Sequence, residues 1–365
     1  MSAPFPAGVL VVGTGLLGTS AALALRRAGV DVRLRDADPN AVGEALGLGA
    51  GRLEEADDAP ASLAVVAVPP EATGVVAAAL LDEGVAEYVT DVASVKVLPA
   101  TEVGERAADP SRYVGSHPMA GREVSGPRGA VADLFEGRPW VLCPDERTSA
   151  EAVERALTLA GLVGAVPVTM PAPDHDAAVA LVSHAPHLMA VLMAARLKDA
   201  PERDVRLAGP GVSDVTRVAG GDPALWTEIL IANAPAVRTV LDAVLDDLEG
   251  VLATLDATDS DDARAALTEL LSAGVAGRAR LPGKRGARPS QFATVTVVIA
   301  DRPGELARLF AAVEAAGANV EDVRIEHRPG APVGAIDIDV RPGIDAPLAA
   351  ALRDGGWNLR DAASR

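Results

Sequence analysis

Aromatic side chains and cysteines are nearly absent from this chain of 365 residues. Aromatic residues make up 2% of it and hydrophobic residues 49%, so alanine, valine and leucine must do the packing. The single cysteine, Cys143, cannot form an internal disulfide, as is usual in a reducing compartment. The length is too great for one small core and predicts two or three domains.

Positive charge and long apolar runs are also scarce. The net charge of -18 excludes nucleic acid and anionic membrane as favoured partners, because both would be repelled. No apolar run approaches the roughly 20 residues of a membrane span, and no charged segment followed by an apolar one opens the chain. We therefore expect a cytoplasmic protein that binds neither nucleic acid nor membrane.

A glycine-rich turn near the N-terminus predicts a dinucleotide site. The apolar run 9–12 suits a buried parallel strand and leads into a G-x-G-x-x-G turn and an Ala/Leu helix. Its glycines allow the tight turn, the approach of a pyrophosphate and close helix–strand packing, and the helix N-terminus attracts phosphate. The predicted cofactor contacts in this turn are Gly13, Thr14, Gly15, Leu16, Leu17 and Gly18.

An acidic residue ends the second predicted strand, 30–35. Asp36 stands at the expected distance from the turn to bind the ribose hydroxyls, and its carboxylate would repel the 2′-phosphate of NADP. We therefore predict NAD as cofactor, although the neighbouring Arg35 leaves NADP as the less favoured alternative. A glycine-rich turn with an incidental acid is the competing structural interpretation.

The βαβ rhythm continues through predicted strands 62–68 and 86–90, with a helix at 71–81 between them. Val68 and Pro69 end the first of these strands beside the expected nucleotide cleft. Ser94 follows the second, and His117 follows a further strand that includes 113–116. In a doubly wound sheet these positions lie at the carboxyl ends of strands, where ligands bind.

Three of the five histidines, His175, His184 and His187, fall in one predicted helix, 174–198. A metal site is one interpretation, because His184 and His187 are three residues apart. No carboxylate follows in an H-E-x-x-H pattern, however, and we expect Pro186 to interrupt the helix between the two histidines. Substrate binding is the preferred interpretation, and no metal is predicted.

Five motifs follow one another along the chain: 91–96, 117–121, 174–176, 183–187 and a segment that begins at Thr216-Arg217 and ends at Trp226. Together, in this order, they resemble the prephenate/arogenate dehydrogenase family of tyrosine biosynthesis. The resemblance covers roughly residues 8–255. It implies a Rossmann domain, an all-helical domain that forms the dimer, and an active site between the two.

The resemblance also implies roles for single residues. His117 matches the catalytic base, and Ser94 matches the serine that bonds the reacting hydroxyl and this histidine near the cofactor. Arg217 matches the arginine that pairs with a substrate carboxylate, a task that suits its fork of donors. Asp214 could orient Arg217 or form an ordinary surface pair.

His187 and Ser183, four residues apart on one helical face, are the predicted substrate contacts from the predicted helix. His184 could equally brace the helix or touch the ligand. Trp226 is either core or part of the dimer-related site.

Two neighbouring residues bear on the choice of substrate. Glu123 matches a gating glutamate of the family. Arg122 would favour the prephenate dianion over arogenate, unless it points to solvent or pairs with Glu123.

Three further helices are predicted at 222–233, 234–255 and 259–276. The basic, Pro/Gly-rich segment that follows them, 278–290, is predicted to be a linker rather than a nucleic-acid tail. The remainder predicts the order βαββαβ and resembles an ACT domain, a small amino-acid sensor. Its strand-to-helix turn could bind the carboxylate of an amino acid, with L-tyrosine the first candidate. The predicted regulatory residues are Asp301, Arg302, Pro303, Gly304 and Asn319. A purely structural ferredoxin-like module is the alternative.

The predicted organisation is an α/β Rossmann domain (1–170), an all-α substrate and dimerisation domain (171–277), a linker (278–290) and an α+β ACT domain (291–365). The predicted function is NAD-dependent oxidative decarboxylation of prephenate to 4-hydroxyphenylpyruvate, with feedback by tyrosine. Arogenate dehydrogenase is one alternative, and a catalytically inactive sensor of NAD and amino acids is another.

Overall fold

The computed structural model describes residues 4–121, 124, 126–257, 260–281, 292–327 and 333–360. The chain divides into two compact units, 1–246 and 247–365, which are considered separately. This division falls inside a helix, whereas the predicted domains meet near residue 277, so those boundaries stay a prediction.

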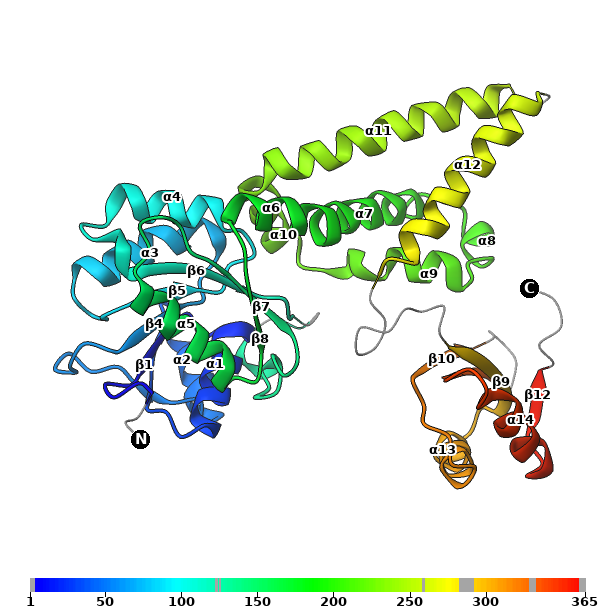
Figure 1. The fold of residues 1–365 in the computed structure, drawn as a ribbon, viewed down its shortest axis with the longest axis horizontal. Helices are drawn as coiled ribbons and strands as arrows, with labels where there is room; N and C mark the ends of the chain where they lie inside the picture. The colour runs from blue at the N-terminus through cyan, green and yellow to red at the C-terminus, as the bar shows by residue number, and fades with distance from the viewer. Residues whose placement is uncertain are drawn as a thin grey trace. The chain divides into compact units, whose positions relative to one another are not determined.

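An eight-stranded sheet forms the centre of the first unit (Figure 1). Its order is β3-β2-β1-β4-β5-β6-β7-β8, and all neighbouring strands are parallel except β6 and β7. The strands are β1 (Val9–Val12), β2 (Val32–Arg35), β3 (Arg52–Leu53), β4 (Leu63–Val66), β5 (Val89–Asp91), β6 (Tyr113–Pro118), β7 (Pro139–Cys143) and β8 (Val166–Thr169). The predicted doubly wound sheet is confirmed, and chain order reverses between β1 and β4.

Helices cover both faces of this sheet because its central strands are apolar on both sides. Val9 and Val11 of β1 belong to one core, while Leu10 and Val12 belong to the other. The surrounding helices are α1 (Leu16–Arg27), α2 (Pro39–Gly47), α3 (Pro70–Asp82), α4 (Val97–Arg106) and α5 (Ala150–Leu162), with short 3-10 turns η1 (Pro110–Arg112) and η2 (Pro127–Gly129). This two-sided burial is what the unbroken apolar runs predict.

A helical segment follows the sheet. Its elements are α6 (Ala172–Val179), the π turn η3 (Ala180–His184), α7 (Ala185–Leu197), α8 (Glu202–Val205), α9 (Pro210–Thr216), the 3-10 turn η4 (Arg217–Gly220), α10 (Pro223–Ala232) and α11 (Ala234–Asp256). We had expected Pro186 to interrupt the helix, but the helix continues through this residue. Proline cannot donate to the carbonyl four residues before it, and the wider π turn lets α6 run into α7 without that bond.

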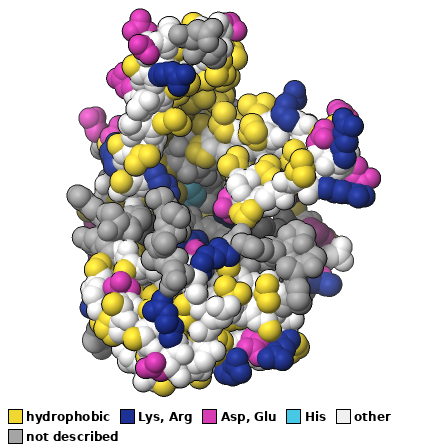
Figure 2. Space-filling view, turned by 90° about the vertical axis from the view of Figure 1, so that its right-hand side faces the viewer, with side chains coloured by type: hydrophobic (Ala, Val, Ile, Leu, Met, Phe, Trp, Pro, Cys, Tyr) yellow, Lys and Arg dark blue, Asp and Glu magenta, His cyan; other side chains and the backbone are white. Residues whose placement is uncertain are grey.

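The continuous run Ala172–Leu197 is long and apolar enough, by length and composition alone, to cross a membrane. The expectation that no run approaches this length was wrong, because alanine, valine, leucine and methionine surround the three histidines. Several large side chains of the helical segment are exposed, among them Leu181, Val182, Leu192, Met193 and Ile231 at 48% to 65%. Figure 2 shows many hydrophobic side chains on one face of the molecule.

The second unit contains α12 (Asp261–Arg278) and a four-stranded antiparallel sheet in the order β10-β11-β9-β12. Its elements follow as β9 (Ala293–Ala300), α13 (Glu305–Ala315), β10 (Asp322–His327), β11 (Val333–Val340), α14 (Asp345–Asp354) and β12 (Asn358–Arg360). Helices α13 and α14 pack on the face of this sheet that carries Val297 and Ile338. The predicted βαββαβ order is therefore present, while residues 282–290 of the predicted linker lie outside the described residues.

Two helical glycines should respond in opposite ways to substitution by alanine. A Cβ on Gly18 would lie 1.9 Å from the carbonyl oxygen of Gly13, so Gly18→Ala should destabilise the protein by about 2 kcal/mol. A Cβ on Gly43, in α2, would meet no atom within 4 Å, so Gly43→Ala should stabilise by about 0.5–1 kcal/mol. Urea unfolding measures both changes, and equal stability of the two variants would contradict the packing argument.

Candidate active site

The glycine turn lies where chain order reverses in the sheet, between β1 and β4. A Cβ on Gly13 would lie 2.4 Å from the carbonyl oxygen of Ala67, so the two loops that follow these strands touch here. A Cβ on Gly15 would meet nothing within 4 Å. Open space above the turn, at the uncapped N-terminus of α1, fits the pyrophosphate of a dinucleotide.

Asp36 is held beside this turn by Thr14. The hydroxyl of Thr14 donates to Asp36 Oδ2 at 2.7 Å, its backbone N–H donates to the same oxygen, and the N–H of Asp38 donates to Oδ1. Burial alone would raise the pKa of Asp36, but these hydrogen bonds outweigh it, and the pKa lies below its ordinary value. An ionised carboxylate at this position suits a ribose diol and repels a phosphate.

Arg35, which could have favoured NADP, is already paired. Its guanidinium makes two hydrogen bonds to Glu54, with Nη2 and Oε1 2.8 Å apart. Glu54 directly follows β3, and the β2–β3 register places it beside Arg35. The pair neutralises the cation that a 2′-phosphate would need.

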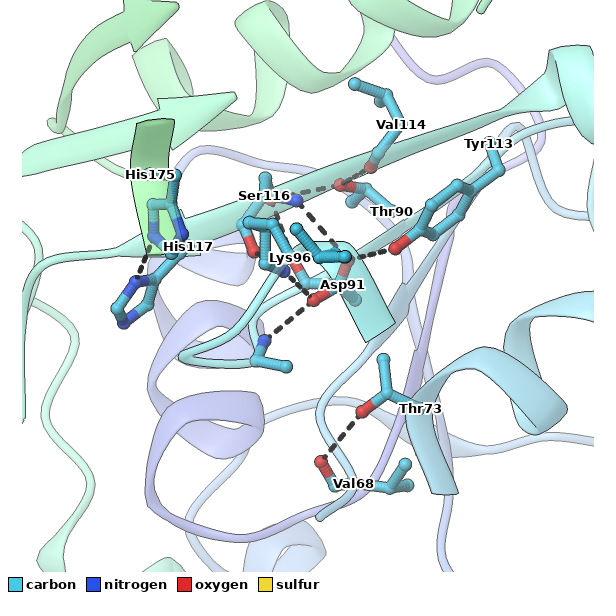
Figure 3. A network of polar contacts seen from close by, with 12 residues as sticks. Val68, Thr73, Thr90, Asp91, Lys96, Tyr113, Val114, Ser116, His117 and His175 are labelled. Atoms are coloured by element: carbon cyan, nitrogen blue, oxygen red, sulfur yellow. Dashed lines mark hydrogen bonds and ion pairs between the residues drawn. The ribbon is translucent and has the colours of Figure 1, made fainter. Parts of the chain in front are cut away.

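A buried polar network supports the carboxyl ends of β5 and β6 (Figure 3). The Lys96 ammonium is fully buried and bonds Asp91, as well as the carbonyl of Ser116 at 2.6 Å. Asp91 also accepts from the hydroxyl of Tyr113 at 2.6 Å and from the N–H of Ala93 at 2.8 Å. Each buried charge therefore has its partners, and the loop 91–96 is fixed from below.

His117 lies at the end of β6 and contacts a histidine of the helical segment. Its Nδ1 is 2.9 Å from Nε2 of His175, and Nδ1 of His175 is 2.8 Å from Oδ1 of Asp176 (Figure 3 shows the two histidines). His175 is 1% exposed and Asp176 4% exposed. Three side chains thus form a chain that ends on a buried carboxylate.

The same carboxylate begins α4. Asp176 Oδ1 accepts from the N–H of Lys96 at 2.8 Å, and Oδ2 accepts from the N–H of Val97 at 2.9 Å. These N–H groups have no partner inside the helix, and negative charge is favourable at a helix N-terminus. Asp176 therefore ties the helical segment to the loop that carries Ser94.

The environment keeps His117 neutral. Burial lowers the pKa of His117 well below its ordinary value, and His175, Lys96 and His184 lower it further. A neutral imidazole at the carboxyl edge of the sheet can accept a proton from a bound hydroxyl.

His184 is buried against Asn233, which follows α10. The Asn233 side-chain nitrogen is 3.1 Å from His184 Nδ1 and 2.8 Å from the carbonyl oxygen of Asp176. Burial lowers the pKa of His184 to about 4, although Asp176 opposes this effect. His184 is thus a neutral imidazole whose Nδ1 accepts a hydrogen bond and holds helices together.

His187 stacks on Trp226. The two ring centroids are 3.5 Å apart and the planes are 6° from parallel. A Cβ on Gly221 would lie 2.5 Å from Trp226 Nε1 and 3.2 Å from His187 Cε1, so only glycine permits this stack. Burial lowers the pKa of His187. The stack makes a flat, rigid wall on α7.

Other predicted site residues have varied surroundings. Ser94 is half-buried in the loop after β5, and among the described residues its side chain makes no hydrogen bond to His117. Ser183 is half-buried in the π turn, where the four-residue spacing of an α-helix no longer sets the helical face. Asp214 in α9 and Arg217 in η4 are exposed. Glu123 and Arg122 lie outside the described residues.

The remaining predictions concern cofactor, metal and regulation. Leu16 and Leu17 begin α1, and Val68 and Pro69 lie in the loop after β4, so all four are close to the β1–β4 reversal. Within the described residues, no group of three or more histidine, cysteine or acidic side chains could hold a metal ion. The predicted regulatory residues belong to the second unit and lie before and after α13.

Sequence reasoning assigned no role to His175, Asp176, Asn233 or Glu54. The 174–176 motif had been noticed, but its distance from His117 in sequence gave no reason to pair them. A His-Asp dipeptide in an apolar helix was the available signal. Nothing in the sequence pointed to Asn233.

Two family models match most of the chain. The prephenate dehydrogenase nucleotide-binding domain matches residues 21–169, and the prephenate dehydrogenase dimerization domain matches residues 171–271. A probable prephenate dehydrogenase of Streptomyces niveus is 40% identical over 95% of this chain and 98% of its own. A cyclohexadienyl dehydrogenase of Zymomonas mobilis is 32% identical over 69% of this chain and 90% of its own.

Solved structures agree with this assignment. Aquifex aeolicus prephenate dehydrogenase, in complex with hydroxyphenyl propionate and NAD+, aligns with a TM-score of 0.65 and 27% identity, covering 73% of this chain and 96% of the other. Synechocystis arogenate dehydrogenase aligns with a TM-score of 0.60 and 25% identity, covering 72% of this chain and 97% of the other. With the glycine turn, His117 and the helical segment already in place, the chain belongs to the prephenate dehydrogenase family of NAD-dependent oxidoreductases.

Proposed function

We propose that this protein oxidises and decarboxylates prephenate to 4-hydroxyphenylpyruvate. The observation that carries the proposal is His117, a neutral imidazole at the carboxyl edge of a dinucleotide-binding sheet. Prephenate has a ring carboxylate, a pyruvyl side chain and a 4-hydroxyl. His117 accepts the hydroxyl proton, and oxidation of that carbon lets the ring lose carbon dioxide and become aromatic. The bound nicotinamide supplies the hydride acceptor.

Substrate carboxylates need cations or donors, since the chain is acidic overall. Arg217 offers a planar fork for one carboxylate, and His187 and Ser183 on α7 and the π turn offer further donors. The His187–Trp226 stack supports this role, because it fixes the imidazole against a rigid surface. In this proposal Asp214 orients Arg217, Glu123 gates the cleft, and Ser94 meets the reacting hydroxyl.

Prephenate is preferred here over arogenate, whose side chain carries an ammonium group. Arg122 supports prephenate, because a cation would favour the dianion. The similarity to an arogenate dehydrogenase keeps the second substrate as the competing candidate. A catalytically inactive sensor is less favoured, because Ser94, His117, His187 and Arg217 are all present in one chain.

Steady-state NADH formation tests this function directly. With saturating NAD+, we expect a larger kcat/KM for prephenate than for arogenate. His117→Asn should lower kcat with prephenate by about 100- to 10,000-fold, the usual contribution of a general base, while NADH binding is kept. Faster oxidation of arogenate would reverse the substrate assignment, and an unchanged rate in His117→Asn would remove His117 as the base. No turnover of either substrate by the unaltered protein would favour the sensor alternative.

NAD selectivity should depend on Glu54 as well as on Asp36. Glu54→Gln removes the carboxylate that neutralises Arg35, so we expect kcat/KM with NADP+ to rise about tenfold while that with NAD+ stays within about twofold. Glu55→Gln, which removes the neighbouring acidic charge, is the matched control, because within the described residues the ion pair of Arg35 is with Glu54. An unchanged cofactor ratio in Glu54→Gln would show that Arg35 does not face the 2′ position.

Regulation and assembly complete the proposal. The exposed aliphatic side chains of the helical segment support a homodimer through this part of the chain, in line with the matched dimerization domain. The C-terminal βαββαβ module supports an ACT-type sensor for L-tyrosine. The buried, reduced Cys143 is compatible with work in the cytoplasm.

Tyrosine should lower the rate of the full chain at subsaturating prephenate. The N–H groups at the start of α13 can take the amino-acid carboxylate, and Asp301 can take its ammonium. Asp301→Ala should therefore raise the tyrosine concentration for half-inhibition about tenfold. Asp354→Ala, an exposed carboxylate at the end of α14, should leave it unchanged. Equal effects of the two variants would argue for tyrosine binding elsewhere.

A further inference from the structure

The contact between His117 and the helical segment gives His175 and Asp176 a role in the reaction that the sequence alone did not suggest. We propose that His175 and Asp176 form a proton relay with His117, in which they fix its tautomer and share the proton that it takes from the substrate hydroxyl. The proposal rests on the proposed function for the identity of that hydroxyl. The relay itself depends only on the three side chains and their contacts.

The tautomers follow from Asp176. Its oxygens face the N–H groups of Lys96 and Val97, so the carboxylate is ionised and only accepts hydrogen bonds. His175 must therefore carry its proton on Nδ1, which is 2.8 Å from Asp176 Oδ1. A neutral His175 then has a lone pair on Nε2, which accepts from Nδ1–H of His117 at 2.9 Å. The unprotonated nitrogen of His117 is Nε2, the atom that can act as base.

The proton then has a defined path. The O–H bond of the substrate breaks as Nε2–H of His117 forms, and the electron pair left on oxygen forms the C=O bond as the hydride on that carbon leaves for the nicotinamide that the site would bind. The Nδ1–H bond of His117 breaks as Nε2–H of His175 forms. His117 becomes neutral again, and the positive charge resides on His175 beside the Asp176 carboxylate. The charge on His175 is stabilised by the adjacent Asp176 carboxylate, whereas a charge on His117 would be disfavoured by burial and by Lys96.

Neighbouring charged groups leave Asp176 as the relevant carboxylate. Lys96, at the start of α4, disfavours a cation on His117, but Asp91 on β5 pairs with this lysine. His184 in the π turn is neutral near pH 7, because its pKa is about 4. His175 donates its Nδ1–H hydrogen bond to the carboxylate of Asp176. A proton shared between the two histidines is therefore stabilised chiefly by Asp176.

The geometry also makes Asp176 a positioning residue for the loop after β5. Oδ1 of Asp176, which orients His175, also accepts from the N–H of Lys96, and Oδ2 accepts from the N–H of Val97, two and three residues beyond Ser94. One carboxylate from the helical segment thereby determines the positions of both the base, His117, and the predicted hydroxyl-binding serine, Ser94.

Two isosteric variants separate charge from shape. Asp176→Asn keeps the volume but cannot accept from all three donors, and His175→Gln can accept from His117 through Oε1 but cannot take a proton. In both we expect kcat with prephenate to fall about 10- to 100-fold, with KM for NAD+ within about threefold of the unaltered enzyme. Asp174→Asn, an exposed carboxylate in the same helical turn, should leave kcat unchanged. Thermal unfolding of each variant establishes that it is folded.

The pH profile separates a relay from a merely structural role. Loss of the Asp176 charge makes protonation of the histidine pair harder, so the acid limb of kcat/KM should move about one pH unit lower in Asp176→Asn. If the carboxylate only braced α4, the rate would fall and the limb would stay where it is. Such a result, together with a kcat in His175→Gln within threefold of the unaltered enzyme, would overturn the relay.

Nitrogen-15 NMR of histidine-labelled enzyme tests the tautomers without any substrate. At pH 7 we expect both His117 and His175 to be protonated on Nδ1, with the His117 preference lost in His175→Phe. Protonation of His117 on Nε2 in the unaltered enzyme would refute the relay. Because this readout needs no turnover, failure of the proposed function would appear separately, as an absence of prephenate-dependent NADH formation by an enzyme with the expected tautomers.

Discussion

The Asp176 carboxylate accepts hydrogen bonds from Lys96, Val97 and His175, which belong to different parts of the chain. A buried carboxylate is tolerable only if its lone pairs are satisfied, and here the donors are the open end of a helix and an imidazole. Its own backbone carbonyl accepts from Asn233. The Asp176 carboxylate therefore fixes three features together. They are the position of α6 on the sheet, the start of α4 and the orientation of His175 and His117.

Close to this carboxylate, a second set of hydrogen bonds holds the buried ammonium of Lys96. Lys96 is held by Asp91 and the Ser116 carbonyl, while Asp91 also accepts from the hydroxyl of Tyr113 and from the N–H groups of Ala93 and Ser116. The pKa of Tyr113 is raised well above its ordinary value by burial and by Asp91, so it stays a neutral donor. The result is a pre-organised hydrogen-bond network around the Lys96 ammonium, whose charge helps to keep His117 neutral and able to accept a proton.

One aromatic ring and one imidazole form a rigid contact near the predicted site. Trp226 lies flat on His187, and Gly221 leaves the room for this contact. Pro186 lies between His184 and His187, and the π turn absorbs its missing N–H without ending the helix. In a chain packed mostly with aliphatic side chains, two planar groups thus form one rigid wall near the predicted site, while Phe135 and Trp140 pack in the core of the sheet.

Short-range pattern determined much of this protein. Unbroken apolar runs, the glycine turn and Asp36 predicted the parallel sheet and the nucleotide site, because each depends on residues that are close in sequence. The βαββαβ order of the second unit was likewise readable from alternation and turns. The tertiary structure alone decided that Glu54 neutralises Arg35, that Asn233 holds His184, and that His175 faces His117 across 58 residues. Hydrogen bonds of this kind require groups within about 3 Å, and no local pattern specifies which distant segments the packing of helices on a sheet will bring that close.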